Sequence, residues 1–173
     1  MDMIEQILTR RSIRTFQDRA VDEQTIRALL EAGMSGPSAV NARDWSFLVV
    51  TDRNMLNRMA DANGRPAEPL RGAALGILVC GDCKRTFSKA PDFWIVDCAI
   101  AAQNITLAAQ ALGLGSVWLG TWPHQDRVAN QRALFSLPED IAPHSILAIG
   151  YPAETPKGVK TLWEEDRVHY EAW

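Results

Sequence analysis

The stretch from Phe93 to Leu112 constrains this chain most, because it is apolar on nearly every side when it is wound as a helix. Its apolar residues include Ala99, Ile100, Ala101, Ala102, Ile105, Leu107, Ala108, Ala109 and Leu112. A helix with this pattern is buried on most sides. The other elements must therefore pack around it, or it must contribute to a subunit interface. Gln103, Asn104 and Gln110, with the glycines that follow, make the region too polar and interrupted to span a bilayer.

The segments around this helix alternate between helical and strand patterns. Asp22 and Asp52 are suitable N-caps, and Gly33 is a suitable C-cap for the helix that Asp22 begins. The expected helices cover residues 3–10, 22–33, 52–60, 93–112 and 127–135, and the expected strands cover 45–50, 73–80, 116–119 and 145–149. This order predicts a mixed α and β protein with about five helices on a small sheet.

The bulk composition narrows the class of protein. Of the 173 residues, 47% are apolar, which is enough to bury a full core, so residues 1–173 are expected to form a single domain. The N-terminus carries Asp2 and Glu5 and no long apolar run, so we expect no secretory signal, no membrane association and a cytoplasmic location. The formal net charge of −3 disfavours a partner that is a nucleic acid.

The cysteines allow two interpretations. Cys80 and Cys83 form a C-x-x-C pair, the spacing of a redox dithiol. Cys80 also closes the apolar run 77–79, which favours a buried strand, and no second pair or nearby histidine completes a zinc site. Cys98 falls in the apolar helix and is expected in the core. The three histidines show no metal-ligand spacing, so no metal is expected, and a dithiol role is the minor alternative.

A cluster of cations follows the first helix. Arg10, Arg11, Ser12 and Arg14 lie within five positions. Guanidinium groups pair with phosphate oxygens, and a hydroxyl adds a neutral donor. In a chain that is acidic overall, such a cluster indicates a site for one specific anion. The alternative is a solvated basic patch.

Two later segments have the composition of ligand contacts. Residues 36–41 read Gly-Pro-Ser-Ala-Val-Asn, a rigid turn with short polar side chains that suits a flat heteroaromatic ring, although an ordinary capped turn has the same residues. Gly113 and Gly115 end a helix and precede a strand, the reverse of the dinucleotide fingerprint. Gly120, at the end of that strand, would let backbone amides approach a ligand closely.

Together these segments resemble the FMN-dependent nitroreductase family. The resemblance covers nearly the whole chain, including Val168–Glu171. Five family motifs are matched in order. Residues 10–14 match the R-R-S-x-R opening, residues 36–45 match the A-P-S-x-x-N-x-Q-P-W loop, and residues 111–118 match the helix end A-L-G-L-G-S-x-W. Residues 138–140 match P-E-D, and residues 150–154 match G-Y-P-A-E.

The resemblance implies an α+β fold, in which helices flank a central, mostly antiparallel sheet and a C-terminal tail of residues 152–173 extends onto a partner subunit. It implies a homodimer that uses FMN as cofactor, NAD(P)H as reductant and a small-molecule electron acceptor. The spaced aromatic residues of the tail, which include Trp163, Tyr170 and Trp173, fit a segment that packs along a surface.

The resemblance also implies four groups of cofactor-binding residues. Arg10, Ser12 and Arg14 would bind the FMN phosphate, with Arg11 on the ribityl side. Pro37, Ser38, Ala39 and Asn41 would come from the other subunit and flank the isoalloxazine. The backbone at Trp118, Leu119, Gly120 and Thr121 would face flavin N5 and O4. Lys160, or in its place Lys157, would reach the phosphate.

This chain departs from the family pattern in four ways. Arg43 and Asp44 replace the usual Gln-Pro, and Gly36 replaces an alanine. Residues 63–71 contain no clear ribityl ligand. There is also little room for the helical insertion that covers the active site in larger members, which implies an open pocket.

The reaction implied is hydride transfer from NAD(P)H through flavin N5 to a flat, electron-poor nitroaromatic or quinone, by a ping-pong mechanism. Because the flavin supplies this chemistry, no catalytic side chain is expected. Trp118 and Trp122 either wall the pocket or pack in the core. The alternatives are dehalogenation or metabolite tailoring on the same fold, a flavin-binding module without catalysis, and, from the arginines alone, nucleic-acid binding.

Overall fold

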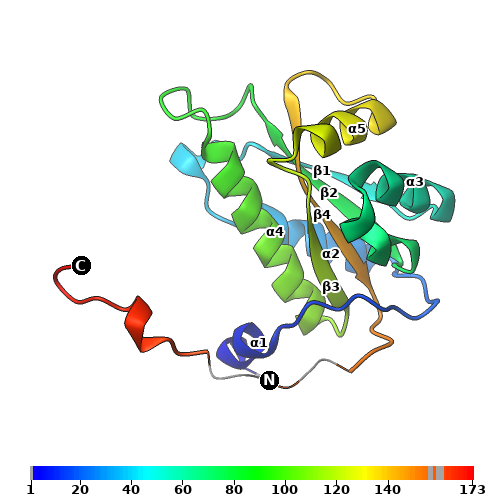
Figure 1. Ribbon diagram of the computed structural model, residues 1–173, viewed down its shortest axis with the longest axis horizontal. Helices are drawn as coiled ribbons and strands as arrows, with labels where there is room; N and C mark the ends of the chain where they lie inside the picture. The colour runs from blue at the N-terminus through cyan, green and yellow to red at the C-terminus, as the bar shows by residue number, and fades with distance from the viewer. Residues whose placement is uncertain (1, 156–157, 159–161) are drawn as a thin grey trace.

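The computed structural model describes residues 2–155, 158 and 162–173 (Figure 1). Its helices and strands are α1 (Met3–Thr9), α2 (Glu23–Met34), β1 (Trp45–Val50), α3 (Arg53–Asn63), β2 (Leu75–Asp82), α4 (Phe93–Ala111), β3 (Gly115–Gly120), α5 (Gln125–Phe135) and β4 (Ile141–Gly150). Short 3-10 turns are η1 (Ala39–Asn41), η2 (Arg65–Arg71) and η3 (Glu165–Arg167). The expected order of helices and strands is confirmed, with boundaries that differ by a few residues.

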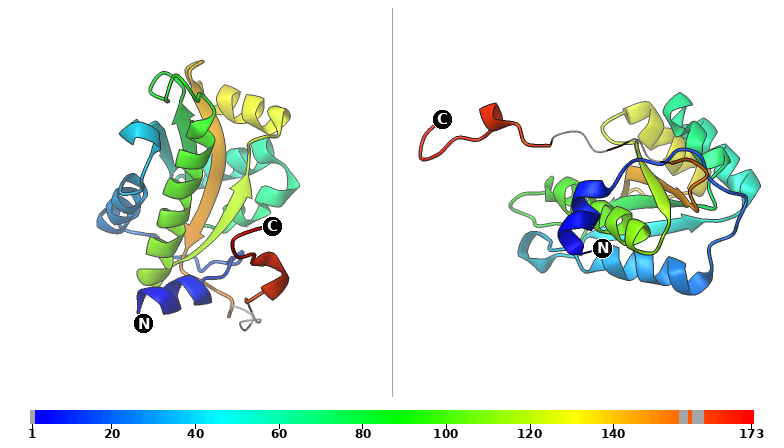
Figure 2. Two further views of the ribbon diagram at one scale, coloured as in Figure 1. Left: turned by 90° about the vertical axis from the view of Figure 1, so that its left-hand side faces the viewer. Right: turned by 90° about the horizontal axis from the view of Figure 1, so that it is seen from below.

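The strands form one four-stranded sheet in the order β1-β2-β4-β3, and every neighbouring pair is antiparallel. Helices α2 and α4 cover one face of the sheet, and α3, α5 and η2 cover the other (Figures 1 and 2). This arrangement confirms the α+β fold with a central antiparallel sheet. β1 and β3 are the edge strands, so the outer edge of β3 is paired with no other strand in the described residues.

The central strands are buried on both faces. In β2, Leu75, Ile77 and Val79 pack toward α2 and α4, whereas Leu78 and Cys80 pack toward α3. The alternation explains why the sequence reads there as a nearly continuous apolar run. Burial raises the pKa of the Cys80 thiol to about 12. This burial favours the core interpretation of Cys80 over a redox dithiol.

The two expected N-caps are confirmed, and the expected C-cap is wrong. Asp22 accepts from the Thr25 N–H, and Asp52 accepts from the Met55 N–H, each at 2.8 Å. Gly33 lies inside α2, which continues to Met34 before the Ser35 C-cap. A Cβ at Gly33 would approach Ile105 side-chain atoms to 2.9 Å, so this glycine allows α2 to pack closely on α4.

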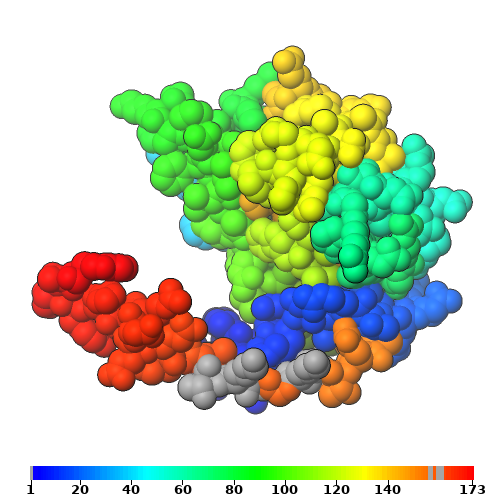
Figure 3. All heavy atoms as spheres, in the orientation of Figure 1, coloured from blue at the N-terminus to red at the C-terminus, as the bar shows by residue number. Residues whose placement is uncertain are grey.

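Two terminal segments expose apolar side chains. Helix α1 exposes Met3, Ile4, Ile7 and Leu8. The C-terminal residues 162–173 lie apart from the sheet and its helices (Figures 1 and 3), and Leu162, Trp163, Tyr170 and Trp173 are exposed there. Among the helices that the structure describes, none combines the length and the apolar character needed to cross a membrane.

Candidate functional site

The segment after α1 lies along the outer edge of β3. The Ile13 N–H donates to the Ser116 carbonyl at 2.9 Å, and Ser12 and Ser116 form a parallel β-bridge. A Cβ at Gly115 would lie 2.7 Å from the Ile13 Cβ, so only glycine permits this approach. The packing therefore fixes residues 10–14, the arginine segment, at the start of the strand.

Glu154 holds the same segment from the chain that follows β4. Its Oε1 accepts from the backbone N–H of Arg14 at 2.5 Å and of Thr15 at 3.1 Å. These two hydrogen bonds, and to a smaller extent the charge of Arg14, lower the pKa of the Glu154 carboxyl. The sequence places Glu154 in a motif without a role, and the fold shows that it anchors the arginine segment.

A cavity of about 310 Å³ lies between α1, the arginine segment and the C-terminal end of α4. Arg10 and Arg11 line it, whereas Ser12 and the exposed Arg14 lie outside its lining. The Arg11 Nη1 donates to the carbonyls of Leu8 at 3.0 Å and Arg10 at 2.7 Å, so this guanidinium is already hydrogen-bonded to the backbone. Within the described residues, the guanidiniums of Arg10 and Arg14 have no hydrogen-bond or ion-pair partner, and both remain available to an anion.

The backbone of β3 presents donors along its outer edge. The Ser116 carbonyl points outward, because it accepts from Ile13 there. Directions alternate along an antiparallel strand, so the N–H and C=O groups of Trp118 and Gly120 also point outward, and those of Leu119 point toward β4. The outward amides are therefore those of Trp118 and Gly120, whereas the Leu119 N–H points toward β4 and the Thr121 N–H donates to the His144 carbonyl at 3.3 Å.

Two residues that the sequence did not single out meet at the end of β3. Arg127 of α5 donates from Nη1 to the Gly120 carbonyl at 2.9 Å, and Asn63 of α3 donates from Nδ2 to the same oxygen at 3.3 Å. The Thr121 hydroxyl donates to the Asn63 Oδ1 at 2.9 Å. No local signal marks these contacts, because they join three elements that are distant in sequence.

The loop of residues 37–41 lies at the other end of α4. The Ala39 N–H donates to the two carboxylate oxygens of Asp97 at 3.0 and 3.2 Å, and Ser38 Oγ accepts from the Arg43 N–H at 2.9 Å. Val40 has a φ of 48°, which is strained for a β-branched residue. Pro37 and Asn41 are exposed. The loop is therefore held in an unusual conformation by a side chain of α4.

Asp97 is buried next to a second carboxyl group. Asp44 is fully buried, and neither of its carboxylate oxygens has a hydrogen-bond partner among the described residues. Burial, with a smaller contribution from the neighbouring Asp44, raises the pKa of Asp97. The departure from the family's Gln-Pro at this position thus places an acidic side chain beneath the loop.

The two expected halves of the site lie far apart within one chain. Asp97 holds the loop near the N-terminal end of α4, and Gln110 lines the arginine cavity near its C-terminal end. Thirteen residues of α-helix separate them by about 20 Å, and Figure 1 shows the two regions at opposite ends of α4. A ligand that touches both regions of one chain would have to span this distance.

An aromatic cluster lies beside the end of β3. The Trp118 ring lies 5.7 Å from the His144 ring, which in turn lies 6.0 Å from Trp94. Burial lowers the pKa of His144 to about 4, so the imidazole is neutral at pH 7. Trp118 is 37% exposed, and Trp122 packs edge-on against Trp94 at 5.2 Å. Trp122 therefore belongs to the packed core, while Trp118 reaches the surface.

Lys160 and Lys157, the expected late contacts to phosphate, lie outside the residues that the structure describes.

The chain matches known proteins over most of its length. A family model described as Nitroreductase family matches residues 7–80 and 67–151. A protein of Methanothermobacter thermautotrophicus, provisionally named NADH dehydrogenase/NAD(P)H nitroreductase, is 49% identical over all of this chain and 88% of its own length.

Solved structures agree in fold. A protein of Bacteroides thetaiotaomicron with the same provisional name is 40% identical and has a TM-score of 0.91, over 99% of this chain and 98% of its own. An FMN-dependent nitroreductase of Clostridium difficile is 28% identical and has a TM-score of 0.90, over 98% of this chain and 99% of its own.

Proposed function

Because the chain belongs to the nitroreductase family, we propose that it is an NAD(P)H-dependent FMN oxidoreductase whose flavin lies along the outer edge of β3. The observation that carries this proposal is the distribution of donors on that edge. Cationic donors gather beside Ser116, and outward backbone amides follow toward Gly120, about 13 Å further along the strand. A phosphate at one end and a heteroaromatic ring at the other match this order.

The residues fit FMN with changes to the expected set at Arg11 and at the end of β3. Arg10, Ser12 and Arg14 would bind the phosphate, and the guanidiniums of Arg10 and Arg14 would supply the charge for it. Arg11 would support the segment, since its Nη1 is bonded to backbone carbonyls. The Trp118 and Gly120 amides would meet the polar edge of the ring. When bound, FMN supplies hydride acceptance and delivery at N5.

The second half of the site would come from a second copy of the chain. In the proposed homodimer, the partner would supply residues equivalent to Pro37, Ser38, Ala39 and Asn41, and the loop of each chain, about 20 Å along α4 from its own arginine segment, would serve the partner's site. The exposed apolar side chains of α1 and of residues 162–173 support the same proposal, because a partner would cover them. The tail would extend onto that partner.

The chain's own residues would bind and orient substrates and would exchange no proton with them. His144, the titratable group packed on Trp118, is neutral and buried. The exposed part of Trp118 offers a flat surface to a nicotinamide or an electron-poor acceptor such as a nitroaromatic or quinone. We propose that the nicotinamide leaves before the acceptor occupies the same space, which gives ping-pong kinetics.

An absorption spectrum of the purified protein, followed by anaerobic titration with NADH and with NADPH, tests this proposal. We expect a flavin spectrum that bleaches with at least one nicotinamide and returns when a quinone or nitroaromatic is added. A flavin spectrum that neither nicotinamide bleaches would instead establish a flavin-binding module. Protein that takes up no added FMN would contradict the proposed function altogether.

A further inference from the structure

The Gly120 carbonyl is held by two side chains from different helices. Arg127 donates to it at 2.9 Å and Asn63 at 3.3 Å, and the Thr121 hydroxyl fixes Asn63 through its Oδ1 at 2.9 Å. Asn63 and Thr121 are completely buried. We call Arg127, Asn63 and Thr121 the carbonyl clamp. Its members lie on α5, on α3 and just after β3, so it ties the strand end to both helices on that face.

Glycine at this position needs such a constraint. Of the atoms in the described part of the chain, a Cβ at Gly120 would meet the Trp122 carbonyl oxygen alone, at 4.0 Å, so packing there does not demand a glycine and does not restrain one. A glycine backbone has more conformational freedom than that of any other residue. Two hydrogen bonds to its carbonyl, one of them from a cation, restrict that freedom.

We propose that Arg127 is a positioning residue that, through the carbonyl clamp, holds the peptide group between Gly120 and Thr121 and so fixes the end of β3, along whose edge the ligand lies. The inference rests on the proposed function in one respect, because the ligand that lies along this end of β3 is the flavin. Arg127 itself need not touch the ligand. The clamp sets the direction of the strand end before any ligand arrives.

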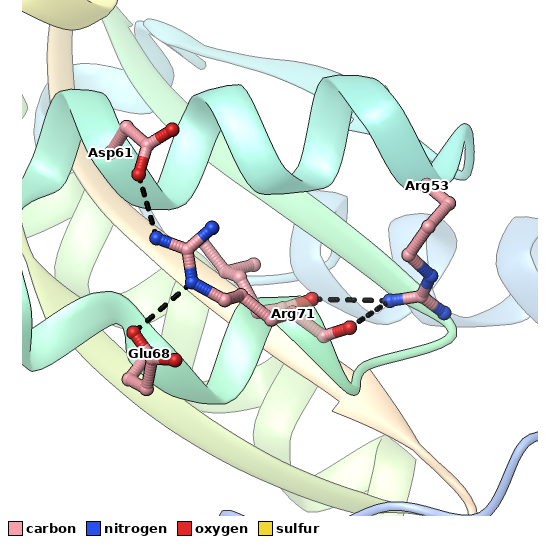
Figure 4. A network of polar contacts seen from close by, with 5 residues as sticks. Arg53, Asp61, Glu68 and Arg71 are labelled. Carbon is pink, nitrogen blue, oxygen red and sulfur yellow. Dashed lines mark hydrogen bonds and ion pairs between the residues drawn. The ribbon is translucent and has the colours of Figure 1, made fainter.

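Arg53 provides a matched control. Its guanidinium also donates to backbone carbonyls, those of Leu70 at 3.4 Å and Arg71 at 2.5 Å (Figure 4). Arg71 in turn pairs with Asp61 and Glu68 through its own guanidinium. Arg53→Met therefore removes the same kind of bond as Arg127→Met and leaves the end of β3 intact.

Hydrogen exchange on the protein without flavin tests the clamp directly. In Arg127→Met we expect faster exchange in residues 118–122 and unchanged exchange in the remaining strands. Arg127→Lys, which keeps a cationic donor, should restore slow exchange in part, and Arg53→Met should leave residues 118–122 as in the wild type. Unchanged exchange in Arg127→Met would overturn the proposal. If Arg127→Met fails to fold, Arg127→Lys takes its place, because partial restoration still leaves residues 118–122 exchanging faster than in the wild type, and exchange equal to the wild type would then overturn the proposal.

Flavin affinity, measured by quenching of FMN fluorescence, gives the second readout. We expect FMN to bind about tenfold more weakly to Arg127→Met, with partial recovery in Arg127→Lys and no change in Arg53→Met. Equal affinity in wild type and Arg127→Met would overturn the positioning role. If wild type itself binds no FMN, the proposed function fails, while the exchange experiment still decides whether the clamp exists.

Discussion

The two ends of α4 hold the two halves of the proposed site by different physical means. At its C-terminal end, close packing of Ile13 on Gly115 and backbone hydrogen bonds fix the arginine segment. At its N-terminal end, the buried carboxyl of Asp97 holds the loop, and the buried imidazole of His144 packs against Trp94. Close packing therefore holds the C-terminal half of the site, whereas titratable groups, Asp97 and His144, contribute to the stability of the N-terminal half. We call these the end governed by shape and the end governed by protonation.

The largest expected effect comes from His144, at the end governed by protonation. Its pKa is about 4 in the folded protein and 6.5 in the unfolded chain, so the unfolded chain binds the proton first as the pH falls. The stabilisation is complete above pH 6.5 and is lost between pH 6.5 and 4, by at most about 3 kcal/mol. Urea unfolding at pH 7.5, 5.5 and 4.5 measures this slope.

His144→Gln should remove this part of the acid destabilisation, whatever its effect on stability at pH 7.5. His124→Gln is the control, because His124 is exposed at the start of α5. An unchanged slope in His144→Gln would mean that the buried imidazole does not govern this end of the molecule.

Gly115→Ala tests the end governed by shape. The new Cβ would lie 2.7 Å from the branched Ile13 side chain, which the surrounding core cannot move freely. We expect a loss of about 2 kcal/mol in the free energy of unfolding, independent of pH between 5 and 8. Gly72→Ala is the matched control, since a Cβ added there would meet no atom of the described residues within 4 Å and the φ of Gly72 is negative. If the loss of unfolding free energy in Gly115→Ala depended on pH, the two ends of α4 would not differ in the way proposed here.

Substitution of Asp97 should have a smaller effect on the free energy of unfolding, and its dependence on pH should be opposite to that expected for His144. Asp97→Ala removes the acceptor of the Ala39 N–H, and we expect it to cost about 1 kcal/mol. Asp97→Asn keeps an acceptor and removes the buried charge. Because the folded pKa of Asp97 is raised above 3.8, its stabilisation is complete below pH 3.8 and declines as the pH rises through the folded value.

Wild type should therefore lose stability relative to Asp97→Asn as the pH rises above 3.8, and the two proteins should agree at more acidic pH. Chemical denaturation of both proteins across this range measures the difference. A constant difference at every pH would show that the carboxyl pair carries no linked proton.

The sequence predicts most of the fold because the decisive signals are local. The apolar run of residues 45–50 predicted β1 at its observed bounds, and Asp22 and Asp52 marked the starts of two helices. The prediction that Gly33 is a C-cap was wrong because glycine has two common roles: it ends helices, and it permits close helix packing. The position of the Ile105 side chain against Gly33 shows that the second role applies here. The contact that decides this position lies 72 residues away in sequence.

The candidate site was predictable only in part, for the same reason. Arg10, Ser12 and Arg14 form a recognisable local cluster. Arg127 and Asn63 do not, because their shared partner is a backbone carbonyl, which any residue would supply. The direction of the Trp118 and Gly120 amides depends on the pairing of β3 with Ser12 on one side and β4 on the other.

Substitution of Glu154 should have the smallest effect on stability, and it tests most directly what holds the arginine segment. Its carboxylate is exposed and, among the described residues, bonds to the backbone N–H groups of Arg14 and Thr15, so its loss should loosen the arginine segment and leave the core intact. In Glu154→Ala we expect faster hydrogen exchange in residues 12–16 and a small decrease in unfolding midpoint; Glu154→Gln, which keeps an acceptor oxygen, should lie between it and the wild type. Since the Glu154 pKa is lowered, the contact is complete above pH 4.5 and weakens as the pH falls. If Glu154→Ala leaves exchange in this segment unchanged, packing of Ile13 on Gly115 is sufficient to hold the arginines, and shape alone governs this end.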